Sequence, residues 1–229
     1  MARGSVYLIG SGQGGTLSTV VKRALEGAKR SGKRPRVAAS YAAMHHSTSG
    51  LSFMVSTAAK VFGVDVERFF VPGEQGNASD KDGRAIVERA DVIFVSGGDP
   101  VAGAELFTSS GADAWLREAR ERGTALVGVS AGSMMLCAFW ASWPDEPDAS
   151  APFDGGALVP CTGVVPNLVI DCHAEEEGWS ELKIVRQMLL AKGGGSVGVR
   201  TIGVPSGGAV VVDADGRLED VGRPSFTLT

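Results

Sequence analysis

Cysteine, histidine and long apolar runs are all scarce in this sequence. The 229 residues include three cysteines, and Cys137, Cys161 and Cys172 show no metal-binding spacing. An odd set of this kind argues against a disulfide scaffold and favours a reducing compartment. No stretch approaches the roughly 20 apolar residues of a membrane span, and the early run VYLIG is too short for a signal peptide. We therefore expect a soluble, cytoplasmic protein.

Positive charge is also in short supply. The net charge is −4 and the isoelectric point is about 5.4, and the basic run at 29–34 is local. This balance offers little attraction to nucleic acid or to an anionic membrane, so we expect neither as a partner. Apolar residues make up 44% of the chain and charged residues 21%, so a large core can form.

Short apolar runs rich in β-branched residues alternate with longer amphipathic segments as far as residue 141. The runs IFV and ALVGV are apolar throughout, which is typical of parallel strands buried on both faces. The alternation predicts an α/β fold of three layers, with helices on both faces of a mostly parallel sheet. The predicted strands are 5–10, 36–41, 64–71, 91–97 and 124–129, and the predicted helices are 16–30, 51–62, 81–90, 101–121 and one from Ala131.

The pattern loosens after residue 141. Three prolines and four acidic residues at 141–157 predict a loop. Short strands are predicted at 157–160, 162–165 and 168–172, followed by a helix at 179–192 and a strand at 199–204. A final alternating run turns at Asp215–Gly216 and predicts a C-terminal hairpin. Since no repeat or linker interrupts the chain, we expect one domain over residues 1–229.

The first glycine-rich loop resembles a dinucleotide fingerprint but lacks its acidic partner. The run GSGQGG at 10–15 contains G-x-G-x-x-G between a predicted strand and a predicted helix. The acid that should follow about 20 residues later is absent from the stretch AASYAAMHH. We therefore expect a tight turn beside the active-site edge of the sheet, and no nucleotide or other cofactor.

A serine ends the predicted strand ALVGV. The run GVSAGS at 128–133 has the form G-x-S-x-G, and a second apolar run follows at once. On a strained strand-to-helix turn, small neighbours let a serine Oγ stand above the sheet. The pattern favours Ser130 as a nucleophile. The alternative is a plain turn in which the serine caps a helix.

A serine nucleophile needs a base, and the sequence offers three histidines. His173 follows the apolar run LVID and lies C-terminal to Ser130, so we predict that it is the base. His45 and His46 stand in a Ser/Thr-rich stretch, which fits a surface loop or the wall of a substrate pocket. Because the three histidines have no metal-ligand spacing, we expect no metal.

Backbone N–H groups are the predicted stabilisers of the negative charge that acyl transfer develops on oxygen. Ala131 directly follows Ser130 at the start of the predicted helix. The glycine pair in SGGD, after the strand IFV, lets a backbone N–H approach a substrate carbonyl. We predict Gly98 and Ala131 as the donors, with a simple strand-to-helix turn as the alternative for the glycine pair.

Three motifs taken together, IFVSGGDP, LVGVSAGSMMLC and VIDCHA, resemble the peptidase E and cyanophycinase family of serine peptidases. The resemblance spans roughly residues 5–213 and implies a class I glutamine amidotransferase-like, flavodoxin-like fold. It also implies Ser130 as nucleophile, His173 as base, and Gly98 and Ala131 as oxyanion donors. A glutamine amidotransferase is disfavoured because those enzymes carry cysteine at the turn. A homodimer is left open.

The third catalytic residue is where the sequence departs from this family. The family usually places a glutamate in the loop after the penultimate strand, whereas Ser206 stands there. A serine carries no charge with which to hold an imidazolium. Glu175, two residues after His173, is our first substitute, unless it is only a solvated member of an acidic run. Asp145 is the second substitute and Asp171 the third.

The substrate class is a second departure. The family recognises aspartyl groups and often carries arginines after the histidine, but here that segment reads AEEEGWSELKIVRQ, with Arg186 late. The three glutamates would fit a cationic or neutral group if they face the site. Asp99–Pro100 also departs from peptidase E, which tends to have asparagine there, although cyanophycinase-like members tolerate aspartate.

These features favour a serine hydrolase that cleaves a peptide or isopeptide bond in a small or acidic peptide. The alternative, motivated by Ser206, is a catalytically weak or inactive member kept for ligand binding.

Overall fold

The computed structural model describes most of the chain. The described residues are 2–12, 15–28, 34–44, 60–74, 80–144, 155–191 and 198–228. None of the helices in these ranges has the length and apolar character that a membrane span needs.

Seven strands form the central sheet. They are β1 (Val6–Ile9), β2 (Val37–Ser40), β3 (Val66–Arg68), β4 (Val92–Val95), β5 (Ala125–Val129), β10 (Gly208–Val212) and β11 (Leu218–Gly222). Their order is β11-β10-β1-β5-β4-β2-β3. β1, β5, β4, β2 and β3 run parallel, whereas β10 and β11 form the predicted antiparallel hairpin at one edge.

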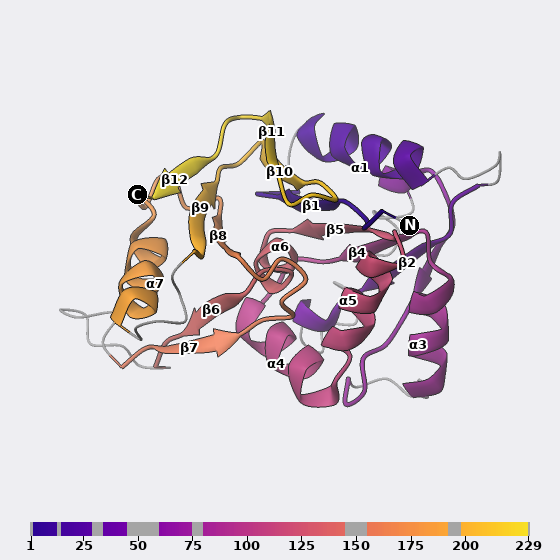
Figure 1. Cartoon of the computed structure of the whole chain (residues 1–229), viewed down its shortest axis with the longest axis horizontal. Coiled ribbons are helices and arrows are strands. Elements are labelled where there is room, and N and C mark those ends of the chain that lie inside the picture. The colour runs from indigo at the N-terminus through magenta and orange to yellow at the C-terminus, as the bar shows by residue number, and fades with distance from the viewer. Residues whose placement is uncertain are drawn as a thin grey trace.

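Helices cover both faces of this sheet (Figure 1). The helix α1 (Gly15–Ala28) lies on one face, and α3 (Asp80–Arg89), α4 (Pro100–Ser110) and α5 (Asp113–Glu121) lie on the other. Alternate residues of β1 enter two different apolar clusters, Val6 and Leu8 on one face and Tyr7 and Ile9 on the other. A strand buried on both faces requires this period of two. The mixed α/β fold with a mostly parallel sheet is therefore confirmed.

Two smaller sheets lie to one side of the central sheet (Figure 1). The strands β6 (Phe139–Ser142) and β7 (Ala157–Pro160) form a pair. The strands β12 (Phe226–Leu228), β9 (Arg200–Val204) and β8 (Leu168–Cys172) form a three-stranded sheet next to α7 (Ser180–Ala191). The short helix α6 (Ala131–Met135) joins these parts, because the N–H of Ala138 just beyond it donates to Leu168 O at 2.9 Å.

Several predicted elements differ in the structure. The helix predicted at 101–121 is two helices, α4 and α5, because Gly111 ends α4 in the left-handed conformation. The helix from Ala131 is only α6, since Phe139 and Trp140 already pair with β7. No strand forms at 162–165, whose N–H groups bond instead to the turn after α6. The predicted helix at 51–62 falls mostly on residues outside the described part.

The start of α6 lies unusually close to the end of β4. A Cβ atom added at Gly132 would lie 2.1 Å from Val95 O and 2.6 Å from Ser96 O. Real Cβ atoms do not approach a carbonyl oxygen so closely, so any larger residue must push the helix away from the sheet. The second glycine of the G-x-S-x-G motif thus fixes the position of the turn that carries Ser130.

We expect Gly132→Ala to lower the free energy of unfolding by about 1–3 kcal/mol, because overpacking a rigid site forces the backbone to move. Urea unfolding of the variant measures the loss. Gly15→Ala is the matched control, since no atom of the described residues lies within 4 Å of a Cβ at that position. Equal stability of the two variants would show that the contact with β4 does not constrain the turn.

Candidate active site

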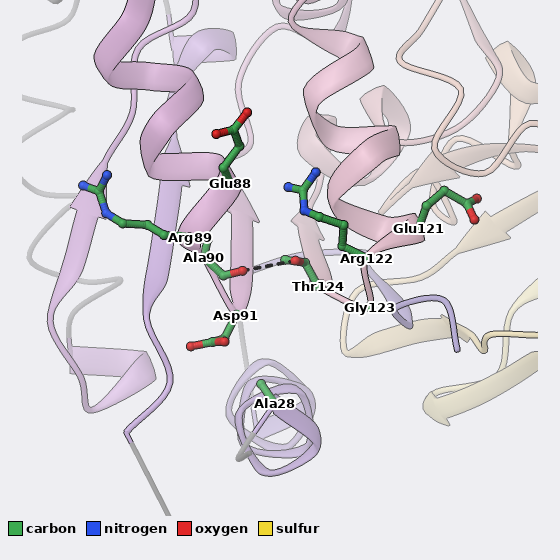
Figure 2. Close-up of a pocket in the computed structure, with 9 residues that line it drawn as sticks. All are labelled: Ala28, Glu88, Arg89, Ala90, Asp91, Glu121, Arg122, Gly123 and Thr124. Carbon is green, nitrogen blue, oxygen red and sulfur yellow. Dashed lines mark hydrogen bonds between the residues drawn. The ribbon is translucent and has the colours of Figure 1, made fainter. Parts of the chain in front are cut away.

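Two pockets of about 360 Å³ lie at opposite ends of the parallel strands. The pocket in Figure 2 is at the edge where β4 and β5 begin, and Thr124 there donates its hydroxyl to Ala90 O at 3.1 Å. Glu88, Arg89 and Glu121 in its wall form ion pairs with neighbouring side chains. Among its described lining residues there is no histidine or cysteine. We place the candidate active site in the second pocket, where the parallel strands end, because Ser130 and His173 both line it.

Ser130 occupies a strained turn between β5 and α6. Its backbone has φ 52° and ψ −124°, a conformation that non-glycine residues rarely adopt. Its N–H donates to Ile9 O at 2.9 Å, and its carbonyl accepts from the N–H groups of Ser133 and Met134. These bonds to β1 and α6 hold the residue in its strained conformation. A strand, a strained residue and a helix thus follow one another here, and the role of Ser130 as a nucleophile stays a prediction.

Ser133, the last residue of GVSAGS, has a structural role that the sequence did not reveal. Its Oγ accepts from Ile9 N at 2.9 Å and donates to Ile9 O at 3.0 Å. The side chain is fully buried. It therefore satisfies both backbone groups at the end of β1 and ties α6 to that strand. A serine in a small-residue turn gives no sequence signal that separates this role from a cap.

His173, at the end of β8 in the three-stranded sheet, faces Ser130, at the end of β5 in the central sheet. The Ser130 Oγ and His173 Nε2 atoms are 2.8 Å apart. His173 follows β8, has φ 49°, and donates its backbone N–H to Val204 O at 2.9 Å. The structure thus brings together the two residues that the sequence singled out, although their catalytic roles stay predictions. His45 and His46 lie outside the described residues.

The loop after β4 lies against Ser130. A Cβ added at Gly97 would be 3.2 Å from Ser130 Cβ. Gly98 has φ 141°, and a Cβ added there would be only 2.1 Å from Ala43 O. Only glycine fits such a backbone. Within the described chain, neither the Gly98 N–H nor the Ala131 N–H donates a hydrogen bond, so both groups are available to a ligand.

The pocket beside Ser130 is strongly polar. Its described lining residues are Ser11, Gly12, Ser130, His173, Glu175, Glu176 and Ser206. Ser11 and Gly12 come from the first glycine-rich loop, so this loop lies beside the candidate site as expected. No cluster of three or more potential metal ligands occurs in the described part of the chain.

Glu175 makes different contacts from those we expected. Its Oε1 accepts from Ser206 N at 3.0 Å and from Arg223 Nη1 at 3.1 Å, and within the described chain it does not bond to the His173 ring. The structure therefore shows no direct contact between this carboxylate and the imidazole among the described residues, and the catalytic role of Glu175 stays a prediction. Burial acts to raise the pKa of Glu175, but hydrogen bonds from its own N–H and from Ser206, with the Arg223 cation, lower it overall. Glu175 is therefore an anion.

Two atoms near the site lack a partner. Glu175 Oε2 is buried and accepts no hydrogen bond from a described residue. Among the described residues, Ser130 alone bonds to the His173 ring, through Nε2, so the other ring nitrogen has no partner there. Arg223, which holds Glu175, comes from the loop between β11 and β12, and no motif in the sequence pointed to it.

Asp171 is buried, and its hydrogen bonds within the described chain do not reach the His173 ring. It is 5% exposed, its Oδ1 accepts from Cys172 N at 2.8 Å, and its Oδ2 has no partner among the residues that the structure describes. The pKa of Asp171 is raised to about 7, mainly by burial. The hydrogen bond from the Cys172 N–H lowers this pKa, and the nearby charges of Glu181 and Glu177 raise it further. Below about pH 7 this acid is mostly neutral, and a neutral acid cannot stabilise an imidazolium as a carboxylate does. Asp145 lies outside the described residues, so its candidacy stays a prediction.

The raised pKa of Asp171 links stability to pH. The folded chain keeps this proton up to about pH 7, while the unfolded chain loses it near the ordinary value of 3.8. The stability that this group contributes to the folded chain is therefore fully present below about pH 4 and is lost as the pH rises through about 7. We expect Asp171→Asn to gain stability relative to the parent between pH 5 and pH 8, measured by urea unfolding. Parallel pH profiles of the two proteins would contradict a buried, protonated Asp171.

Known proteins share the sequence pattern and the fold. The pattern of Peptidase family S51 matches residues 41–216. A solved structure of a peptidase from an acI-B1 Actinobacterium is 21% identical, with a TM-score of 0.74 over 100% of this chain and 95% of that one. A "Putative Peptidase E Protein" from Listeria monocytogenes EGD-e is 14% identical, with a TM-score of 0.65 over 97% of this chain and 100% of that one. No curated protein matches the sequence.

At these identities the two solved structures establish the fold alone, and the family assignment comes from the sequence pattern, which covers most of the chain. The expected resemblance is confirmed: this chain belongs to peptidase family S51, a family of serine peptidases.

Proposed function

We propose that this protein hydrolyses an amide bond in a small peptide, with Ser130 as the nucleophile and His173 as the base. The observation that carries the proposal is the 2.8 Å contact between Ser130 Oγ and His173 Nε2 at the mouth of a polar pocket. A serine hydroxyl is a weak nucleophile until a neighbouring base removes its proton. The strained turn presents that hydroxyl to the pocket.

The reaction proceeds in two halves. His173 Nε2 takes the proton from Ser130 as Oγ bonds to the amide carbon, and the carbonyl oxygen becomes an oxyanion. The imidazolium then gives its proton to the leaving nitrogen, the C–N bond breaks, and an acyl-serine remains. In the second half, His173 takes a proton from water and the water oxygen bonds to the ester carbon. The C–Oγ bond then breaks, the carboxylic acid product leaves, and the imidazolium returns its proton to Ser130 Oγ.

The N–H groups of Gly98 and Ala131 are proposed as the oxyanion donors. Neither has an acceptor in the described chain; Gly98 belongs to the loop that lies against Ser130, and Ala131 begins α6 directly after Ser130. Donors of this kind need no reorganisation as charge develops, and removing one such donor typically costs about 10²–10³ in kcat.

Glu175 is proposed as the acid that orients His173. Ser206 N–H and Arg223 hold its charge in the pocket, and its Oε2 has no donor among the described residues, so it can accept a hydrogen bond. The second nitrogen of an imidazolium requires an acceptor, and apo geometries at catalytic sites are often looser than reacting ones. The carboxylate is bonded to the backbone of Ser206, the position at which the family resemblance expects its glutamate.

A weak or inactive member that binds a peptide without cleaving it is the second candidate. It is favoured by the absence of a carboxylate on the His173 ring among the described residues. The two variants below separate these candidates, because a protein without catalysis has no activity to lose.

We expect Ser130→Ala to lower kcat for peptide hydrolysis by about 10⁴–10⁶-fold, as removal of a nucleophile does in other serine peptidases. Mass spectrometry of a peptide pool incubated with parent and variant identifies and times the cleavage. Ser109→Ala, on the exposed end of α4, is the control. Retention of cleavage by a folded Ser130→Ala protein would overturn the assignment.

We expect Glu175→Gln to lower kcat by about 10³–10⁴-fold, since glutamine keeps the size of the side chain but loses its charge. Without the carboxylate, protonation of the base is less favourable, so the acid limb of the kcat/KM profile should move to lower pH. Glu177→Gln, a neighbouring residue that does not line the pocket, should leave both quantities unchanged. A loss of kcat in Glu175→Gln without the shift in pH profile would indicate a structural role only.

A further inference from the structure

The charge in the active-site pocket is unbalanced. Glu175 and Glu176 both line it, and its described lining residues include no lysine or arginine. Arg223 reaches Glu175 from outside and also donates to Ser206 O at 3.1 Å. That cation is therefore already engaged. Glu176 is exposed and forms no ion pair with a described residue.

We propose that Glu176 binds the ammonium group of the substrate and so selects peptides with a primary ammonium close to the cleaved amide. This inference rests on the proposed function, because it requires the substrate to lie against Ser130. It makes Glu176 a specificity residue, distinct from the proposed catalytic pair.

The charges decide between a cationic and an anionic substrate group. A substrate carboxylate would face Glu176 with no free cation among the described lining residues, which is unfavourable. An ammonium would instead form a charge-assisted hydrogen bond with Glu176. The two neighbouring glutamates thus have different roles. Glu175 is bonded to Ser206 and Arg223, whereas Glu176 binds the ligand.

The size of the pocket limits the substrate. Its volume of about 360 Å³ is at the lower end for ligand sites, which generally occupy about 300–1,000 Å³. A short peptide segment fits such a space. The ammonium can come from a free N-terminus or from a lysine side chain, and the experiment below separates these sources.

The test measures protection of Ser130 from a fluorophosphonate probe, read by mass spectrometry. Alaninamide and lactamide are nearly equal in size but only the first carries an ammonium. N-acetyl-lysinamide and N-acetyl-norleucinamide form the same comparison for the side chain. In one of the two pairs, we expect the ammonium-bearing amide to halve the labelling rate at a concentration about 5–10-fold lower than its neutral partner requires. Added salt should reduce this difference in concentration.

Glu176→Gln should remove this preference, while Glu177→Gln should keep it. Preference within the alaninamide pair assigns the site to an N-terminus, and preference within the lysinamide pair assigns it to a side chain. Equal protection in both pairs, or a preference that survives Glu176→Gln, overturns the inference while the proposed function stands. Failure of the probe to label Ser130 in the folded protein overturns the proposed function itself, and the inference with it.

Discussion

The site depends on one hydrogen bond, between Ser130 Oγ and His173 Nε2, and on the backbone strain that makes it possible. Both residues have positive φ, 52° and 49°. Such conformations cost of order 1–3 kcal/mol each and persist only where the surroundings enforce them. Ile9 O holds the first residue and Val204 O the second. The cost is thus distributed over β1 and β9, which belong to different sheets.

The two sheets must therefore keep a fixed relation for the bond to form. The helix α6 provides that relation, because Gly132 brings it against β4 while the turn after it bonds to β8. Ser133 adds a fully buried link to β1. The proposed catalysis consequently depends on how the central sheet and the three-stranded sheet are held together. Substitutions at buried positions such as Gly132 should therefore lower the activity.

Much of the fold and part of the site follow from the sequence. Apolar runs such as ALVGV predicted buried parallel strands, and G-x-S-x-G between a strand and a second apolar run predicted the turn at Ser130. Local patterns were less informative where a tertiary contact decides the outcome. Gly111 divides a predicted helix, and β6 forms because β7 is available as a partner.

The surroundings of Glu175 could not be predicted for the same reason. Arg223 lies 48 residues away in the chain, and its bond to Glu175 depends on the return of the chain from β11 to β12. The proton on Asp171 likewise depends on burial by segments that are distant in sequence. Charge pattern alone gave three adjacent glutamates at 175–177, whereas the folded chain places two of them at the pocket and one away from it.

The most direct test of the central claim is a pre-steady-state measurement with p-nitrophenyl acetate. An active Ser130–His173 pair predicts a burst of about one p-nitrophenol per chain, together with one acetyl group on Ser130 detected by peptide mapping. The burst should be absent from His173→Ala. A folded protein that gives no burst, or that carries the acetyl group elsewhere, would contradict the claim.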